Sequence, residues 1–200
     1  MTVEEILAAL EEMFGAKREM QDKWGVTAIV PATYLHNAVQ YLKEQSGTKF
    51  EMLVDIAGID YLTYPNHEGP RFAVAYAFKS MSTPGSRIRL KVLVSKESLK
   101  VPTISDLYAN ANWYEREVFD QFGVIFEGHP DLRRLLNHVE FVGHPLRKDY
   151  PAQKRQWLST NDYLLPQLEK RLEELGYKVV QRSKEVETND NEFLEGSIKA

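Results

Sequence analysis

The histidines in the second half of the chain are the first candidates for chemistry. His129, His138 and His144 are nine and six residues apart, and imidazole is both a common metal ligand and a common general base. No two of them have the spacing that would place two ligands on one helix face, so we expect structural hydrogen bonds rather than a metal site. His129 or His144 could form an acid–base site with Asp131 or Asp149 in a free-standing enzyme, but only the fold could bring these groups together.

Other catalytic signatures are absent from the sequence. It has no G-x-S-x-G nucleophile motif and neither of the glycine-rich phosphate loops. It has no cysteine, which excludes disulfides, thiolate zinc sites and cysteine-ligated iron–sulfur clusters. The net charge of -4 gives no reason to expect a nucleic-acid partner.

Targeting signals are also missing. The first ten residues are acidic and resemble neither a secretory signal nor a mitochondrial presequence. No run of about 18 apolar residues occurs, so no membrane-spanning helix is expected. We expect a cytoplasmic protein that reaches a membrane only through a partner.

A dense, charged stretch, residues 113–136, mixes charges with aromatic side chains. Glu115, Arg116 and Glu117 are consecutive, and they cannot all face water while their apolar neighbours find cover. At least one of these charges should therefore be partly buried and paired. Arg116 and Asp120 are four residues apart, but such a helix pair is worth only about 0.2–0.5 kcal/mol. A buried, paired charge makes a segment rigid, which suits an interface.

A locally basic segment follows. The sequence Gly-His-Pro occurs at 128–130 and again at 143–145, and six basic residues outnumber three acidic ones between positions 129 and 155. Its prolines favour an extended, exposed chain. We hypothesise that Arg133, Arg134 and Arg147 pair with carboxylates of a neighbouring protein, because guanidinium groups suit fixed bidentate contacts.

Hydrophobic periodicity predicts the elements that position these residues. Thr2 and Glu5 form a capping-box pattern at the start of the first helix, and Pro84-Gly85 suits a type II turn between two strands. Helices are expected at 3–14, 31–45, 105–110, 112–122, 130–136 and 166–175, and strands or extended segments at 26–30, 50–56, 72–78, 87–94, 124–127 and 177–181.

Strands clustered between helices favour an α+β fold over a doubly wound parallel sheet. We expect a compact α+β domain over residues 1–125, with a small mixed or antiparallel sheet packed against helices. Residues 126–200 are expected to form an extended docking arm with a short helix, and a polar, mobile tail from about residue 182.

The same charged motifs carry a family resemblance. The segment from Glu115 to Leu136, EREVFDQFGVIFEGHPDLRRLL, resembles the signature of the C subunit, which forms the 30 kDa subunit family, of respiratory NADH–quinone oxidoreductase (complex I). GHPLRKDYP at 143–151, DIAGIDYL at 55–62 and the ISDLY stretch from Ile104 are also similar, so the resemblance covers about residues 49–151. Gln121 departs from the pattern, because the family usually has an apolar residue there.

The resemblance implies a non-catalytic subunit in the peripheral arm of a proton-pumping enzyme. Such a chain would bind no cofactor and no small substrate, while FMN and iron–sulfur clusters would lie in partner subunits. It would pack against the D subunit, which helps form the quinone site, and lie near the B and I subunits, at the cytoplasmic face of the bacterial inner membrane. The isolated chain is expected to be inactive. The residues expected to dock on partners are Glu115, Arg116, Glu117, Asp120, His129, Asp131, Arg133, Arg134, His144, Arg147, Lys148, Asp149 and Tyr150.

Three alternatives remain open. Related subunits occur in membrane-bound [NiFe] hydrogenases, formate hydrogenlyases and F420-dependent dehydrogenases. The small soluble enzyme using histidine and aspartate is a second alternative, and a soluble adaptor without any redox link is a third.

Overall fold

The computed structural model describes the chain except for residues 1, 24, 96–97, 155, 157 and 178–200. It divides into two compact units. The first is Met1–His138 with Gly143–Ala152, and the second is Val139–Val142 with Gln153–Ala200. Most of residues 126–152, which the sequence analysis placed in the arm, therefore belong to the first unit.

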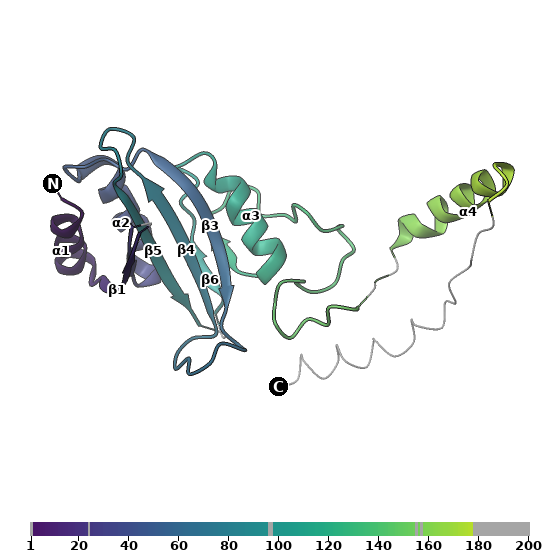
Figure 1. Cartoon of the computed structure of the whole chain (residues 1–200), viewed down its shortest axis with the longest axis horizontal. Helices are drawn as coiled ribbons and strands as arrows, with labels where there is room; N and C mark the ends of the chain where they lie inside the picture. The colour runs from purple at the N-terminus through teal and green to yellow at the C-terminus, as the bar shows by residue number, and fades with distance from the viewer. Residues whose placement is uncertain (1, 24, 96–97, 155, 157, 178–200) are drawn as a thin grey trace. The chain divides into compact units, whose positions relative to one another are not determined.

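A five-stranded mixed sheet organises the first unit (Figure 1). The strand order is β1 (Lys17–Asp22), β2 (Gly25–Ile29), β5 (Arg87–Val94), β4 (Phe72–Lys79), β3 (Met52–Asp60). The β2–β5 pair is parallel and the other three pairs are antiparallel. The expected α+β class with a mixed sheet is confirmed.

The two faces of the sheet differ as the period-two pattern predicts. On one face, alternate residues of β4, from Phe72 to Phe78, are buried in the core. On the other face, Arg89 pairs with Asp22 at 2.8 Å and Lys91 pairs with Glu19. These ion pairs join β5 to β1. The sequence analysis missed β1 because it has no apolar alternation, and charges rather than buried side chains attach it.

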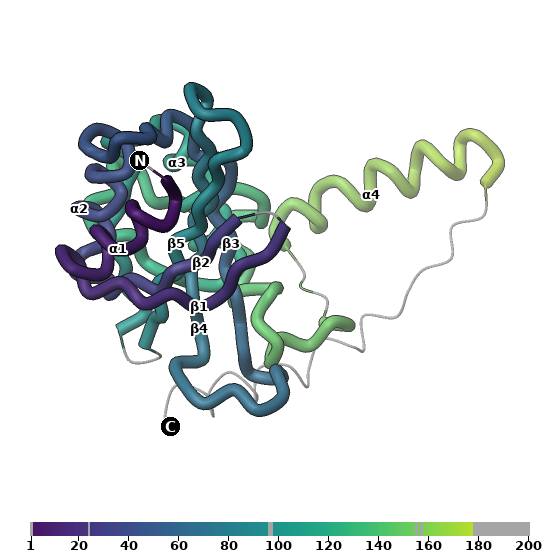
Figure 2. Tube along the Cα trace, turned by 60° about the vertical axis from the view of Figure 1, so that its left-hand side comes forward, coloured from purple at the N-terminus to yellow at the C-terminus, as the bar shows by residue number. Residues whose placement is uncertain are grey.

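Helices cover the buried face. The capping box of α1 (Val3–Phe14) is present, with Thr2 N–H donating to Glu5 at 3.0 Å and Glu5 N–H donating to Thr2 Oγ1 at 3.3 Å. The helix predicted at 31–45 forms as three consecutive pieces: a 3-10 turn η1 (Ala32–Tyr34), α2 (Leu35–Gln40) and a π-helical turn η2 (Tyr41–Gln45). Figure 2 shows α1 and α2 together on one side of the strands.

The helix α3 (Ala111–Phe122) packs along β3. Gly58 of β3 makes this possible, because a Cβ at that position would collide with the ring of Phe122. Just after α3, β7 (Ile125–Glu127) pairs in parallel with β6 (Lys100–Pro102). This pairing attaches the segment that follows α3 to the rest of the first unit.

Two predicted short helices are wrong. Residues 105–110 form turns, because Tyr108 turns into the core and its hydroxyl donates to the carbonyl of Phe50 at 2.5 Å. Residues 130–136 form turns and bends, because Asp120 accepts the backbone N–H groups of residues 135–137. The helix predicted at 112–122 is formed as α3, which begins one residue earlier, at Ala111.

In the second unit, α4 (Ser159–Glu174) begins seven residues before the predicted start, and Pro166 lies inside it. Glu140 accepts from the N–H of Ser159 at 2.7 Å and so supplies the helix with an N-terminal carboxylate. The predicted strand at 177–181 is not formed at Tyr177. Its remainder and the predicted tail lie outside the described residues.

Candidate docking surface

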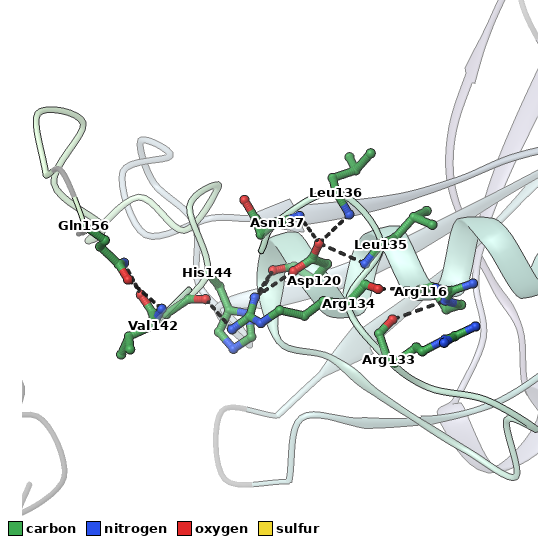
Figure 3. Close-up of polar contacts among 11 residues, drawn as sticks. Arg116, Asp120, Arg133, Arg134, Leu135, Leu136, Asn137, Val142, His144 and Gln156 are labelled. Atoms are coloured by element: carbon green, nitrogen blue, oxygen red, sulfur yellow. Dashed lines mark hydrogen bonds and ion pairs between the residues drawn. The ribbon is translucent and has the colours of Figure 1, made fainter. Parts of the chain in front are cut away.

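Asp120, in the last turn of α3, holds the segment that follows the first Gly-His-Pro motif (Figure 3). Its Oδ1 accepts from Nη1 of Arg134 at 2.6 Å, and its Oδ2 accepts from the N–H groups of Leu135, Leu136 and Asn137 at 2.8–3.1 Å. Burial alone would raise the pKa of Asp120, but these donors lower it to about 2. A single buried carboxylate therefore fixes four consecutive residues.

Arg116 fixes the same segment from the other side. Its Nε and Nη2 donate to the carbonyls of Arg133 and Arg134, each at 3.2 Å. Its guanidinium also lies 5.1 Å from the ring centre of Trp113, a favourable cation–π distance. Arg116 and Asp120, although four residues apart on the helix, do not pair with each other, because each side chain binds the loop instead.

The second motif, residues 143–151, caps the C-terminal end of α3. Nδ1 of His144 donates to the carbonyl of Asp120 at 3.0 Å. The N–H of Leu146 donates to the carbonyl of Gln121 at 3.2 Å, and Nε of Arg147 donates to the carbonyl of Phe122 at 2.7 Å. The last carbonyls of a helix have no hydrogen-bond partner within the helix. A cation near them also interacts favourably with the negative C-terminal end of the helix dipole. This motif thus completes a helix that lies more than twenty residues earlier.

Gly123 allows the cap to approach so closely. Its φ is +78°, and a Cβ there would lie 2.6 Å from Nε2 of His144 and collide with the guanidinium of Arg147. Burial and the positive charges of Arg147 and Arg134 lower the pKa of His144. The ring is therefore neutral at pH 7, and its Nδ1–H is available to the helix carbonyl.

A second carboxylate ties the motif to the sheet. Asp60, at the end of β3, accepts from Nε and Nη2 of Arg71 at 2.9 and 2.8 Å, and from the N–H of Lys148 at 2.8 Å. Arg71 also forms two hydrogen bonds with Asp149, at 2.7 and 2.9 Å. Burial would raise the pKa of Asp60, but Arg71, Lys148 and Leu62 lower it to about 2. The Arg71 bonds likewise lower the pKa of Asp149.

Glu115 is fully buried, as expected for at least one charge of the segment. It accepts from the N–H of Ile104 at 2.8 Å and from the hydroxyl of Thr103 at 2.5 Å. Burial raises its pKa to about 7. His129 lies 3.9 Å away; its Nδ1 accepts from the N–H of Asp131 at 3.0 Å, and its Nε2 donates to the carbonyl of Asn112 at 3.2 Å. Both ring nitrogens thus make structural hydrogen bonds.

The expectation of exposed arginines needs correction. Arg134 and Arg147 are partly buried and bind within the chain, whereas Arg133 faces solvent and pairs with Asp131 at 2.9 Å. The thirteen expected docking residues separate by burial. Buried are Glu115, Arg116 and Asp120; partly buried are His129, Arg134, His144, Arg147 and Tyr150; exposed are Glu117, Asp131, Arg133, Lys148 and Asp149.

The second unit contributes a different surface. The helix α4 has no buried residue. Leucines at positions 164, 165, 168, 172 and 175 lie on one side of it, and Leu164, Leu168 and Leu175 are more than half exposed. Val142 and Gln156 exchange two hydrogen bonds near its start, at 2.7 and 2.6 Å (Figure 3). Apolar stripes on helices normally lie against another element.

No group of three or more metal-ligating side chains occurs among the described residues. In the same part of the chain, no helix is long and apolar enough to cross a membrane.

The comparisons with known proteins decide the family. The model of the respiratory-chain NADH dehydrogenase 30 kDa subunit family matches residues 28–156. The chain belongs to this family. The C subunits of the NADH-quinone oxidoreductases of Burkholderia mallei strain SAVP1 and Burkholderia pseudomallei strain K96243 are each 40% identical to it over 155 residues, which is 75% of this chain and 77% of each relative.

Two solved structures resemble this 30 kDa family member. One is a trypsin-resistant fragment of Nqo5, with a TM-score of 0.59 and 37% identity over 66% of this chain and all of the fragment. The other belongs to the membrane-bound sulfane sulfur reductase, an archaeal respiratory membrane complex, with a TM-score of 0.60 and 25% identity over 90% of this chain and 96% of that chain. The predicted resemblance to the C subunit of complex I is confirmed.

Sequence reasoning missed Asp60 and Arg71, which hold the second motif of this family member to the sheet. A signal was present, because the two opposite charges flank consecutive predicted strands. The resemblance had covered Asp60 without giving it a role.

Proposed function

We propose that this chain is a non-catalytic, scaffolding subunit of the peripheral arm of NADH–quinone oxidoreductase, and that it docks on the D subunit near the B and I subunits. Membership of the 30 kDa subunit family supports the assignment to NADH–quinone oxidoreductase. The exposed leucine stripe of α4 is the observation that carries the docking role. Burying an exposed leucine yields about 1.5–3 kcal/mol. The leucines of α4 at 164, 168, 172 and 175 recur every three to four residues, and an amphipathic helix with such spacing fits a groove on a partner.

The two motifs have separable roles in this proposal. The inward-facing side chains, Asp120, Arg134, His144 and Arg147 among them, position the loop by binding α3. The exposed residues, Glu117, Asp131, Arg133, Lys148 and Asp149, are the ones that contact a neighbour. A loop already ordered by its own chain loses less entropy on binding.

Electron transfer in this proposal takes place in the partners. FMN and the iron–sulfur clusters lie in other subunits, and the isolated chain is inactive. The chain attaches peripherally at the cytoplasmic face of the bacterial inner membrane, through the complex alone.

The test is purification of the tagged full chain from native membranes in mild detergent. We expect the D, B and I subunits to co-purify, together with flavin and iron–sulfur absorbance and NADH–quinone activity, whereas the separately produced chain has none. Two results together would refute the proposal. The chain would be recovered without partner subunits, and the membranes would keep their NADH–quinone activity when the chain is deleted.

A second candidate is the equivalent component of a related membrane-bound respiratory complex. The similarity over 90% of this chain to the sulfane sulfur reductase component favours it. The same purification separates the two, because a complex of that kind would yield other partners and no NADH–quinone activity.

A further inference from the structure

A groove of about 200 Å³ lies between β3 and α3. Residues 56–58 of β3 line one side of it, Val118, Gln121 and Phe122 of α3 line the other, and Leu146 of the second motif also contributes. All of these residues belong to the first unit. The groove is distinct from the leucine stripe of α4.

β3 is an edge strand. Its sheet neighbour is β4 alone, so the backbone groups on its other side have no ladder partner. At the start of the strand, Nδ2 of Asn110 donates to the carbonyl of Leu53 at 2.9 Å and satisfies that group. Farther along, between Val54 and Ile59, no described residue bonds to this edge. An unpaired edge of this kind accepts an added strand.

Gln121 places an amide in the groove. The residue is only 8% exposed, yet within the described part of the chain its side chain has no hydrogen-bond partner. An amide supplies one acceptor and two donors, which is what a passing peptide backbone needs.

The charge of the groove defines the occupant. Asp55 and Glu117 line it and are exposed, and neither has a cationic partner among the described residues. The chain's own residues 185–195 contain five carboxylates and no basic residue. Electrostatic repulsion therefore disfavours residues 185–195 as the occupant and favours a segment that carries lysine or arginine.

We propose that this groove receives an extended, basic segment of another subunit, which pairs with the edge of β3 and hydrogen-bonds the Gln121 amide. The inference rests on the proposed function, because it requires a complex, but it assigns a second docking surface. Backbone pairing supplies affinity, and Asp55 and Glu117 select the charge of the segment.

Hydrogen exchange of the purified complex against the isolated full chain tests the strand pairing. Those N–H groups of residues 54–59 that point away from β4 should exchange at least about tenfold more slowly in the complex, because pairing removes the edge from solvent. Equal exchange in both states would overturn the proposal. Slower exchange across the entire sheet would also overturn it, since that reflects general stabilisation.

Cross-linking identifies the occupant. With Ala57→p-benzoylphenylalanine in the intact complex, light should join this chain to a peptide of another subunit that contains lysine or arginine. A cross-link to an acidic segment, to this chain's own tail or to nothing would contradict the proposal. The matched position is Ala8, an exposed alanine of α1, where no such peptide is expected.

Two variants test the chemistry. The double variant Asp55→Lys with Glu117→Lys should lower the cross-link yield roughly fivefold or more, whereas Glu12→Lys on α1 should leave it unchanged. Gln121→Leu should weaken protection of β3 in the complex while the isolated chain keeps its stability, because the amide makes no hydrogen bond within the described residues. If Gln121→Leu lowers the stability of the isolated chain and leaves β3 protection in the complex unchanged, the amide acts within the chain and the proposal is wrong.

The two failures can be distinguished. If no subunits co-purify with the chain, the proposed function fails. If the complex forms through α4 but β3 exchange and the Ala57 cross-link are negative, this inference alone fails.

Discussion

The backbone N–H of Lys148 donates to the carboxylate of Asp60 at 2.8 Å, across 88 positions of sequence. One end of this bond lies in the second basic motif and the other at the end of β3. The bond makes the motif part of the folded body. Arg147 and Asp149 of the motif also bind within the chain, so its charges serve first of all to fix a loop, and only its remaining exposed side chains are available to a neighbour.

Asp60→Asn should destabilise the first unit by about 3 kcal/mol at pH 7, because Arg71 loses the charge of a buried partner. The pKa of Asp60 is lowered to about 2 from 3.8. Its stabilising contribution is thus complete above pH 4 and is lost as the pH falls through about 2. Urea unfolding at several pH values should show the deficit shrinking below pH 4. A deficit that stays constant down to pH 2 would contradict this assignment.

Gly123→Ala should cost more than Gly15→Ala, although both glycines end helices with a positive φ. At Gly15 an added Cβ meets nothing within 4 Å, so only the backbone penalty of about 1 kcal/mol remains. At Gly123 the Cβ displaces His144 and Arg147, which adds about 1–3 kcal/mol. Thermal unfolding of the two variants measures the difference, and equal losses would show that the cap can move freely.

The sequence predicted the body well because its signals are local. Alternation in residues 72–78 and 87–94 identified β4 and β5, and Thr2 with Glu5 identified the start of α1. β1, whose backbone pairs with β2, was missed because its side chains, Asp22 and Glu19 among them, form ion pairs with β5 and show no apolar alternation. Ion pairs between distant segments leave no periodic pattern in the sequence.

The loop after α3 shows more clearly what could not be predicted from the sequence. Pro130 and Asp131 are good helix-starting residues, yet no helix forms there. Asp120 captures the N–H groups that such a helix would need. The presence of a buried charge in the Glu115 segment could be predicted, but its hydrogen-bond partners depend on the fold.

Adjacent arginines should behave differently. Arg134→Ala should destabilise the isolated chain by about 2 kcal/mol, because Asp120 loses its charged donor but keeps three N–H donors. Arg133→Ala should change stability by less than about 1 kcal/mol, since its pair with Asp131 is exposed. Urea unfolding gives both values. The same loss in both variants would mean that the inward position of Arg134 has no energetic importance.

Glu115→Gln should flatten the pH dependence of stability between about pH 5 and 7. Burial raises the pKa of Glu115 to about 7 from 4.5. The stability that this carboxyl contributes is therefore fully present below pH 4.5 and is lost as the pH rises through 7, with a total change of about 3 kcal/mol. Glutamine keeps the acceptor for the Ile104 N–H without a charge to desolvate. Unfolding free energies measured from pH 5 to 8 should fall for the natural protein and stay level for the variant; parallel curves would argue against a buried, titrating Glu115.

Leu168→Asp with Leu172→Asp should detach the chain from its complex without unfolding the first unit. The two leucines lie on the apolar side of α4, in the second unit, and within the described part of the chain neither of them is buried. Charges in a buried helix groove are strongly unfavourable, so recovery of the D subunit with the tagged chain should fall at least about tenfold. The matched variant Lys170→Asp with Glu173→Lys alters charges on the opposite side of the same helix and should leave recovery unchanged. Equal recovery with both double variants would place the docking contact elsewhere in the chain. Loss with both would indicate that the helix as a whole, rather than its leucine side, is required.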